Sequence, residues 1–307
     1  MKGEVVIFEP YTVKKSISGI DAHLRNSIIL QRELQCRLLI NDIDYTKAQN
    51  EQFDCIIVSY SSFHFPFKKV NHIIDNNSNA KIIWITNEYN IGVPIKNAKY
   101  ITIANYSNQV HKKNVTAFYE VNLNLLFARK PNSLCKKKYD ICYYGTFRRD
   151  REKYFKQYMK DGMILSTSSK NIKQFISFGC MPRFIDRFSW TFGAETLNLF
   201  RYSLYIEDEY THSNFNNLAN RWYEAGFCNA VVFFDSNCKN TILKSEIGEF
   251  YDEIKYFIVS THTELMEKIK QTNLHFENAL NTQKRWRIHE LSLRNNVIEK
   301  IKEIVYA

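Results

Sequence analysis

The chain has 307 residues, of which 45% are hydrophobic and 15% aromatic, so it can bury real cores and is not of the disordered class. Its formal net charge of +10 favours polyanionic partners, nucleic acid first and acidic membrane second, although a Lys-rich solvated surface gives the same balance. No apolar run approaches the ~18 residues of a transmembrane helix, and the opening apolar run is too short for a signal peptide. The seven cysteines form no CxxC motif or Cys/His cluster, which indicates a reduced, cytoplasmic chain without structural zinc.

The first 125 residues alternate short apolar runs with stretches of helical character, of which Leu24–Leu34 is the clearest. Continuous runs of Val and Ile between helices are typical of parallel strands that are buried on both faces. The expected strands of this half are Val5–Phe8, Arg37–Ile40, Asp54–Ser59, Lys81–Thr86, Lys99–Ala104 and Val115–Val121.

Residues 126–138 contain Pro131 and three consecutive lysines, and they are interpreted as a linker. The strand–helix rhythm then restarts, with strands expected in the runs DICYY, MILS, FISFG, SLYI and AVVFF, and with helix over Thr261–Ala307. The sequence therefore predicts an α/β protein with two Rossmann-like domains, 1–125 and 139–285. A C-terminal helix over 286–307 is expected to pack back toward the first domain. Ligands of such open sheets bind beyond the carboxyl ends of the strands, so we expect the site in the cleft between the domains.

The first candidate site is the stretch YGTFRRDRE, which follows the DICYY strand. Gly145 lets the backbone turn without a Cβ, and Thr146 is expected to cap the next helix. Arg148 and Arg151 lie one helical turn apart at a helix N-terminus, which attracts anions. The pattern indicates a phosphate site of a form other than GxGxxG or Walker A. The alternative is a surface helix whose arginines pair with the acidic residues beside them.

The second candidate site lies in IEDEYTHSNFNNLANRWYE, where Glu207 and Tyr210 belong to an acidic strand end. Arg221 and Glu224 follow on one helix face, because residues three apart are neighbours on a helix. A carboxylate there can hold a ribose diol, and an arginine can neutralise a diphosphate. The alternative is an ion pair within the helix, on a solvated face.

A third candidate is Glu88, which follows the strand-like run KIIWIT and could act as a general base toward a hydroxyl. The alternative is a loop carboxylate that caps a helix or pairs with a neighbouring charge. Asp21 and His23 form a weaker candidate after the first strand, since a single His is usually structural.

These pieces, in this order, resemble the DNA β-glucosyltransferases of T-even bacteriophages, which have the GT-B fold. The resemblance runs along nearly the whole chain and is carried by FDCIIVSYSSFHF, KIIWITNE, YDICYYGTFRRDRE, EDEYTHSNF…RWYE and STHTELMEKIK…RIHELSL. The sequence differs from the family at four points. Glu88 stands where the family has an aspartate, the arginine turn is one residue shorter, and the loop before Arg221 is two residues longer. Near the family's N-terminal glutamate we find only Asp21 and His23.

The resemblance implies inverting transfer of a sugar, by default glucose, from a UDP-sugar to a hydroxymethylated pyrimidine in duplex DNA. It implies Glu88 as the catalytic base and a donor site in the C-terminal domain. Weaker expectations concern the acceptor side. The implied donor residues are Gly145, Thr146, Arg148, Arg151, Glu207, Tyr210, Arg221 and Glu224. The weaker acceptor and DNA candidates are Asp21, His23, Ser61, Ser62, Lys68, Lys69, Lys112 and Lys113.

No DxD motif stands in a convincing loop, so no metal site is expected and a divalent metal is not strictly required, although it could stimulate the reaction. We expect a monomer without a membrane partner, in the host cytoplasm if a phage encodes it. The sugar and the modified base stay open. Two alternatives also stay open: a UDP-sugar transferase with a cell-surface or small-molecule acceptor, and a non-catalytic DNA-binding relative.

Overall fold

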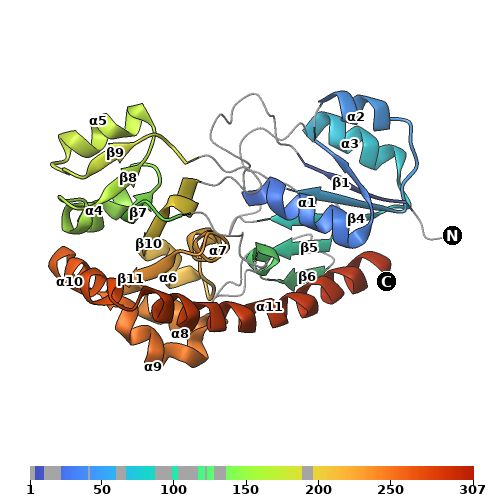
Figure 1. Cartoon of the computed structure of the whole chain (residues 1–307). Helices are drawn as coiled ribbons and strands as arrows, with labels where there is room; N and C mark the ends of the chain where they lie inside the picture. Colours follow the sequence, from blue (N-terminus) through green and yellow to red (C-terminus); the bar gives the residue numbers. More distant parts are fainter. Residues whose placement is uncertain are drawn as a thin grey trace. The chain divides into compact units, whose positions relative to one another are not determined.

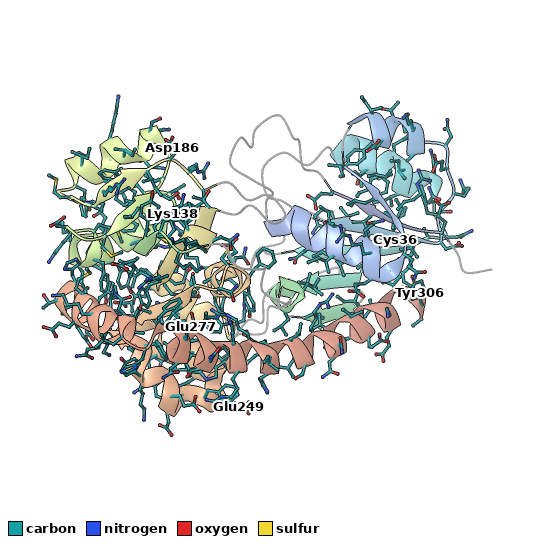
Figure 2. All side chains as sticks on the ribbon, viewed as in Figure 1. Cys36, Lys138, Asp186, Glu249, Glu277 and Tyr306 are labelled. Carbon is teal, nitrogen blue, oxygen red and sulfur yellow. The ribbon has the colours of Figure 1, made fainter. Side chains whose placement is uncertain are left out.

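The computed structural model, drawn in Figure 1, describes residues 4–9, 22–40, 42–59, 67–86, 99–102, 117–121, 123–127, 136–188 and 196–307. The chain divides into two compact units, and each is described by itself. Unit 1 comprises Met1–Leu126 and Leu293–Ala307, and unit 2 comprises Phe127–Ser292. Each unit contains a parallel sheet of six described strands, so the predicted α/β class with two Rossmann-like sheets is confirmed.

The sheet of unit 1 has the strand order β2-β1-β3-β4-β5-β6. Its strands coincide with the predicted apolar runs to within about two residues at either end. The chain order reverses at β1, so the switch point of this sheet lies between the carboxyl ends of β1 and β3. The strands are β1 (Val5–Phe8), β2 (Arg37–Leu39), β3 (Cys55–Ser59), β4 (Lys81–Thr86), β5 (Lys99–Thr102) and β6 (Ala117–Glu120), and the helices are α1 (Ala22–Leu34), α2 (Asp42–Ala48) and α3 (Phe67–Asn76).

Both faces of the unit 1 sheet are buried, as the continuous Val and Ile runs require. Figure 1 shows α2 and α3 side by side, and the ring of Phe8 on β1 packs against Tyr45 of α2 with centroids 5.2 Å apart. Right-handed crossovers place α1 on the opposite face. The C-terminal end of α11 (Phe276–Tyr306) also packs on the unit 1 sheet, since Lys81 Nζ of β4 donates a hydrogen bond to the carbonyl of Val305 at 3.1 Å.

The sheet of unit 2 has the strand order β12-β11-β10-β7-β8-β9. This is the order of a doubly wound dinucleotide-binding sheet, and its switch point lies between β7 and β10. The strands are β7 (Tyr139–Tyr144), β8 (Ile164–Ser166), β9 (Arg183–Ile185), β10 (Phe200–Tyr205), β11 (Val231–Asp235) and β12 (Ile258–Val259), and the helices are α4 (Glu152–Tyr158), α5 (Ser169–Ser177), α6 (Glu209–Asn214), α7 (Asn220–Phe227), α8 (Lys239–Lys244), α9 (Tyr251–Ile254) and α10 (His262–Asn273).

The predicted strand FISFG is wrong, because these residues form the end of α5. The helix begins after Ser168, whose hydroxyl accepts a hydrogen bond from the backbone N–H of Asn171. Such a cap satisfies a donor that a helix start would otherwise leave unpaired. Phe175 is the side chain that the helix buries, and Gly179 follows the helix with φ of +81°. The strand that follows α5 is instead β9, in the run Arg183–Ile185, for which we predicted no strand.

The long C-terminal helix is confirmed, but α11 begins at Phe276 and not at the expected residue 286. Its first part belongs to unit 2 and its last residues, from Leu293, belong to unit 1. In unit 1 Arg294 Nη2 pairs with Glu33 at 2.5 Å, and the Tyr306 hydroxyl donates to the carbonyl of Leu34 at 2.9 Å. Within the described ranges, no helix has both the length and the apolar character that crossing a membrane would require.

Candidate active site

The candidate site of unit 2 lies at the switch point of its sheet, where β7 and β10 end side by side. Gly145 directly follows β7 with φ of +154°, a conformation that favours glycine. A Cβ on Gly145 would lie 3.2 Å from Nη2 of Arg221, so the missing side chain also makes room for that guanidinium. The Thr167 hydroxyl donates to the carbonyl of Gly145 at 2.6 Å and fixes the turn.

Arg151 is the centre of a buried ion-pair network. Its Nη2 lies 2.5 Å from Oε2 of Glu207 and 3.0 Å from Oδ2 of Asp208, and these three side chains are only 6%, 3% and 2% exposed. Burial opposes the charge of Arg151, but Glu207 and the Tyr143 hydroxyl outweigh it and raise its pKa above the ordinary value. The guanidinium therefore stays charged and holds both carboxylates at the end of β10.

Arg221 and Glu224 do not pair with each other, so the alternative of an ion pair within the helix is wrong. Arg221 pairs through Nη1 with Glu207 Oε1, donates from Nε to the carbonyl of Tyr144 at 3.3 Å, and lies over the Tyr143 ring at 5.2 Å. Glu224 accepts a hydrogen bond from the Tyr144 hydroxyl at 2.7 Å. The face of α7 that carries Arg221 and Glu224 thus meets the carboxyl end of β7.

Arg148 is the accessible cation of the site, with 46% of its side chain exposed. It pairs with Asp150, as the surface-helix alternative expected, and its Nη2 also lies 3.4 Å from Oδ2 of the buried Asp208. The predicted cap by Thr146 is wrong: the N-cap position of the first turn, Arg149–Arg151, is Arg148, and no side chain caps it. Thr146 is exposed beside this turn. We call Tyr143, Tyr144, Arg148, Arg151, Glu207, Asp208, Arg221 and Glu224 the switch-point cluster.

Asp208 makes the stability of unit 2 sensitive to acid. Burial would raise its pKa, but the N–H of Thr211 and the guanidinium of Arg151 outweigh burial and lower the pKa to about 2 from an ordinary 3.8. The folded protein therefore binds fewer protons than the unfolded chain below about pH 4, and stability is lost as the pH falls toward 2. We expect this loss, roughly 2 kcal/mol, to shrink in Asp208→Asn when urea unfolding is measured from pH 5 to 2. A variant that loses stability as steeply as the native chain would contradict this.

The remaining predicted residues lie outside the described residues, or have side chains that are not described. Glu88, Asp21, Ser61, Ser62, Lys112 and Lys113 lie outside the described residues. His23 lies in α1, Lys68 and Lys69 lie in α3, and Tyr210 lies in α6, but the side chains of these four are not described. In the described part of the chain no group of three or more His, Cys, Asp or Glu side chains could hold a metal ion. The role of a divalent metal stays a prediction.

The sequence reasoning missed Glu9, which follows β1 directly and therefore lies at the switch point of the unit 1 sheet. Its side chain is fully buried, and its Oε2 accepts a hydrogen bond from the Ser27 hydroxyl at 2.6 Å. Glu9 meets the criterion that singled out Glu88, a carboxylate at the end of a buried strand. The sequence reasoning also missed Tyr143 and Tyr144. The Tyr143 hydroxyl accepts a hydrogen bond from Arg151, and the Tyr144 hydroxyl donates one to Glu224.

No protein-family profile and no curated protein matches the sequence. Solved structures do match it along its whole length. The β-glucosyltransferase of T4 phage in complex with UDP and Mn²⁺ is 16% identical with a TM-score of 0.71, covering 99% of each chain. The same enzyme with its UDP-glucose substrate is 14% identical, also with a TM-score of 0.71, covering 99% of this chain and 100% of that one. A glycosyltransferase involved in avilamycin A biosynthesis is 10% identical with a TM-score of 0.53, covering 98% of this chain and 97% of the other. The chain therefore has the GT-B fold of the T4 phage β-glucosyltransferase.

Proposed function

We propose that this protein is a phage-type DNA glycosyltransferase that transfers a sugar, by default glucose, from a UDP-sugar to a hydroxymethylated pyrimidine in duplex DNA. The observation that carries the proposal is the switch-point cluster, in a fold shared with T4 phage β-glucosyltransferase and with a DNA-modifying β-glucosyltransferase whose substrate is uridine diphosphoglucose. Doubly wound sheets bind nucleotides at this point of the strand order. The cluster offers cations for a diphosphate and a carboxylate for a ribose within one unit.

The charged residues of the cluster and Tyr144 each have a part in the proposed donor site. Two arginines contact the diphosphate and stabilise it as it leaves. They are the exposed Arg148 and, on α7, Arg221, whose guanidinium lies against the end of β7. Arg151 is enclosed by two carboxylates, so it orients Glu207 and Asp208. Its positive charge also stabilises the diphosphate without a direct contact. Glu224, whose carboxylate the Tyr144 hydroxyl orients, accepts the ribose hydroxyls.

The acceptor side of the proposal rests on Glu88 and on the positive charge of the chain. Glu88 follows shortly after β4 and takes the proton of the acceptor hydroxymethyl group, which attacks the anomeric carbon while UDP leaves. A chain with a formal net charge of +10 binds the DNA backbone in a salt-dependent way.

The second candidate function is transfer of a sugar to a small molecule. The fold match to the glycosyltransferase of avilamycin A biosynthesis favours it, but the TM-score of that match, 0.53, is lower than the 0.71 of the T4 phage enzyme. A panel of UDP-sugars and duplexes carrying cytosine, hydroxymethylcytosine or hydroxymethyluracil distinguishes the two. After digestion to nucleosides, a mass increase of one sugar on a hydroxymethylated base supports the proposal. Consumption of UDP-sugar only with small-molecule acceptors would replace it by the second candidate.

Replacing Arg148 by Ala is expected to weaken UDP binding by about 10-fold or more and to leave uridine binding nearly unchanged. The reason is that a charge-assisted hydrogen bond to phosphate contributes roughly 1.5–3 kcal/mol, and uridine has no phosphate. Titration calorimetry with both ligands measures this. Glu224→Ala is the matched contrast, since loss of a ribose contact lowers the affinity for both ligands alike. Equal losses of UDP and uridine binding in Arg148→Ala would remove that arginine from the phosphate site.

A further inference from the structure

The positive charge of the chain is concentrated in one part of unit 2. Residues 136–187 contain thirteen Lys and Arg residues but five Asp and Glu residues, which is a net charge of +8 out of the total of +10. The other residues of the chain are nearly balanced, with 29 basic and 27 acidic side chains. Arg148 and Arg151 of this part belong to the switch-point cluster, so most of the excess lies elsewhere, in the segment that runs from β7 through α4, β8 and α5 to β9.

Five exposed lysines of this segment lie on, or directly after, two neighbouring helices. On α4 the buried side is aromatic, with Tyr154, Phe155 and Tyr158. On α5 it is Phe175, whose ring centroid lies 4.9 Å from that of Phe155, so both helices cover the same face of the sheet. Figure 1 shows the two helices beside β8 and β9. The solvent-facing sides carry Lys153 and Lys156 on α4 and Lys170 and Lys173 on α5. Together with Lys160, which follows α4, these exposed residues are called the lysine face.

Several basic residues of the described surface pair with acidic side chains, but the five lysines of the lysine face do not. Elsewhere Arg37 pairs with Glu4 and Glu51, Arg285 pairs with Glu253, and Lys302 pairs with Glu299. No ion pair to any of the five lysines is found within the described ranges. Lys156 instead lies over the Phe178 ring at 4.5 Å, which holds its ammonium beside the end of α5. The acidic residues nearest to them along the chain, Glu152 and Asp161, make no ion pair with any of the five, so none of these charges is neutralised by a direct contact with a described acidic side chain.

We propose that the lysine face binds the phosphate backbone of duplex DNA, next to the unit 2 donor site. This inference rests on the proposed function, which it deepens by assigning DNA contacts to α4 and α5 in addition to the weak candidates of the N-terminal half. When lysines without acidic partners contact phosphates, the counterions condensed on the DNA are released. This release is the main sequence-independent contribution to the free energy of DNA binding. An anionic membrane fits less well, because α4 and α5 bury their aromatic sides against the sheet and an interfacial helix needs its apolar side free.

The test measures the affinity for an unmodified duplex at several salt concentrations. The triple variant K153Q/K156Q/K173Q is compared with K239Q/K244Q/K270Q, which removes the same charge from three exposed lysines elsewhere in unit 2. Each lost phosphate contact lowers the slope of log affinity against log salt by about 0.9. The lysine-face variant is therefore expected to lose about 2 to 3 from the slope and tenfold or more in affinity at low salt. The control variant is expected to stay close to the native chain.

Three further readouts make the result decisive. UDP binding of both variants, followed by calorimetry, must match the native chain and so shows that unit 2 is folded. Equal losses of DNA affinity in the two variants would overturn the proposal, because the effect would then be one of net charge. So would a loss of binding to anionic vesicles without a loss of binding to DNA, an outcome to which the exposed Ile176 and Met181 beside this face would contribute. Sugar transfer is assayed separately. If the lysine-face variant loses DNA affinity but the native chain transfers no sugar, the DNA-binding surface is supported and the proposed enzyme function is rejected. If the native chain transfers sugar but the salt slope of the variant is unchanged, the enzyme function is supported and the DNA-binding surface is rejected.

Discussion

Replacing Glu88 by Gln is expected to lower sugar transfer to DNA by about 10²-fold or more, the usual contribution of a general base. Gln keeps the size and the hydrogen-bonding capacity of the side chain but cannot take a proton from the acceptor hydroxyl. Affinity for UDP-sugar and for DNA should both survive, because the proposed phosphate contacts come from other residues. The measurement is a single-turnover transfer rate, with both substrates above their dissociation constants.

The matched controls for this prediction are Asp21→Asn, His23→Ala and Glu9→Gln, which remove the two carboxylates and the imidazole that follow β1 along the chain. If Glu88→Gln transfers sugar at nearly the native rate, the base lies elsewhere and these three positions become the candidates. Of the three, Glu9 has a described side chain: it is buried at the unit 1 switch point, where Ser27 orients its carboxylate.

Replacing Arg151 by Ala is expected to destabilise unit 2 by about 3–5 kcal/mol, because removing one partner of a buried ion pair leaves the other charge uncompensated. Here two carboxylates, Glu207 and Asp208, would be left at the end of β10 with side chains only 3% and 2% exposed. Such a loss is a large part of the 5–15 kcal/mol that typically separates a folded domain from its unfolded chain. Urea unfolding at neutral pH measures it.

Arg149→Ala is the control for Arg151→Ala, since Arg149 lies in the same turn but is exposed, and a substitution there should change stability by less than about 0.5 kcal/mol. The physical reason is tested by the triple variant R151A/E207Q/D208N, which also removes the two negative charges. It should recover part of the loss. A triple variant that is less stable than Arg151→Ala alone would show that packing, and not uncompensated charge, explains the effect.

The strands could be predicted because parallel strands that are buried on both faces need continuous apolar runs, and such runs are visible in a single sequence. FISFG failed because a short apolar run is equally compatible with a helix end. The features that decide for a helix are the Ser168 cap and Gly179, with its positive φ. Strand β12 was missed because it has only two residues, Ile258–Val259, too few for a pattern.

The site could be predicted as a set of residues but not as a set of contacts. The spacing of Arg221 and Glu224 predicts that they share a helix face, and they do, but their partners come from other elements. Glu207 lies in the same predicted stretch as Arg221, but Tyr144 is 80 residues from Glu224, and only the strand order brings it to α7. Arg151 was expected to contact a ligand, and the structure adds its buried contacts with Glu207 and Asp208, which no local pattern encodes.

The assignment of the switch-point cluster as the UDP-sugar site is tested most directly by a crystal structure of the protein with UDP. The diphosphate oxygens are predicted to lie within hydrogen-bonding distance of Arg148 and Arg221, and the ribose hydroxyls within hydrogen-bonding distance of Glu224. UDP bound elsewhere on the chain, or bound at the switch point with its diphosphate away from both arginines, would contradict the assignment and, with it, the proposed chemistry.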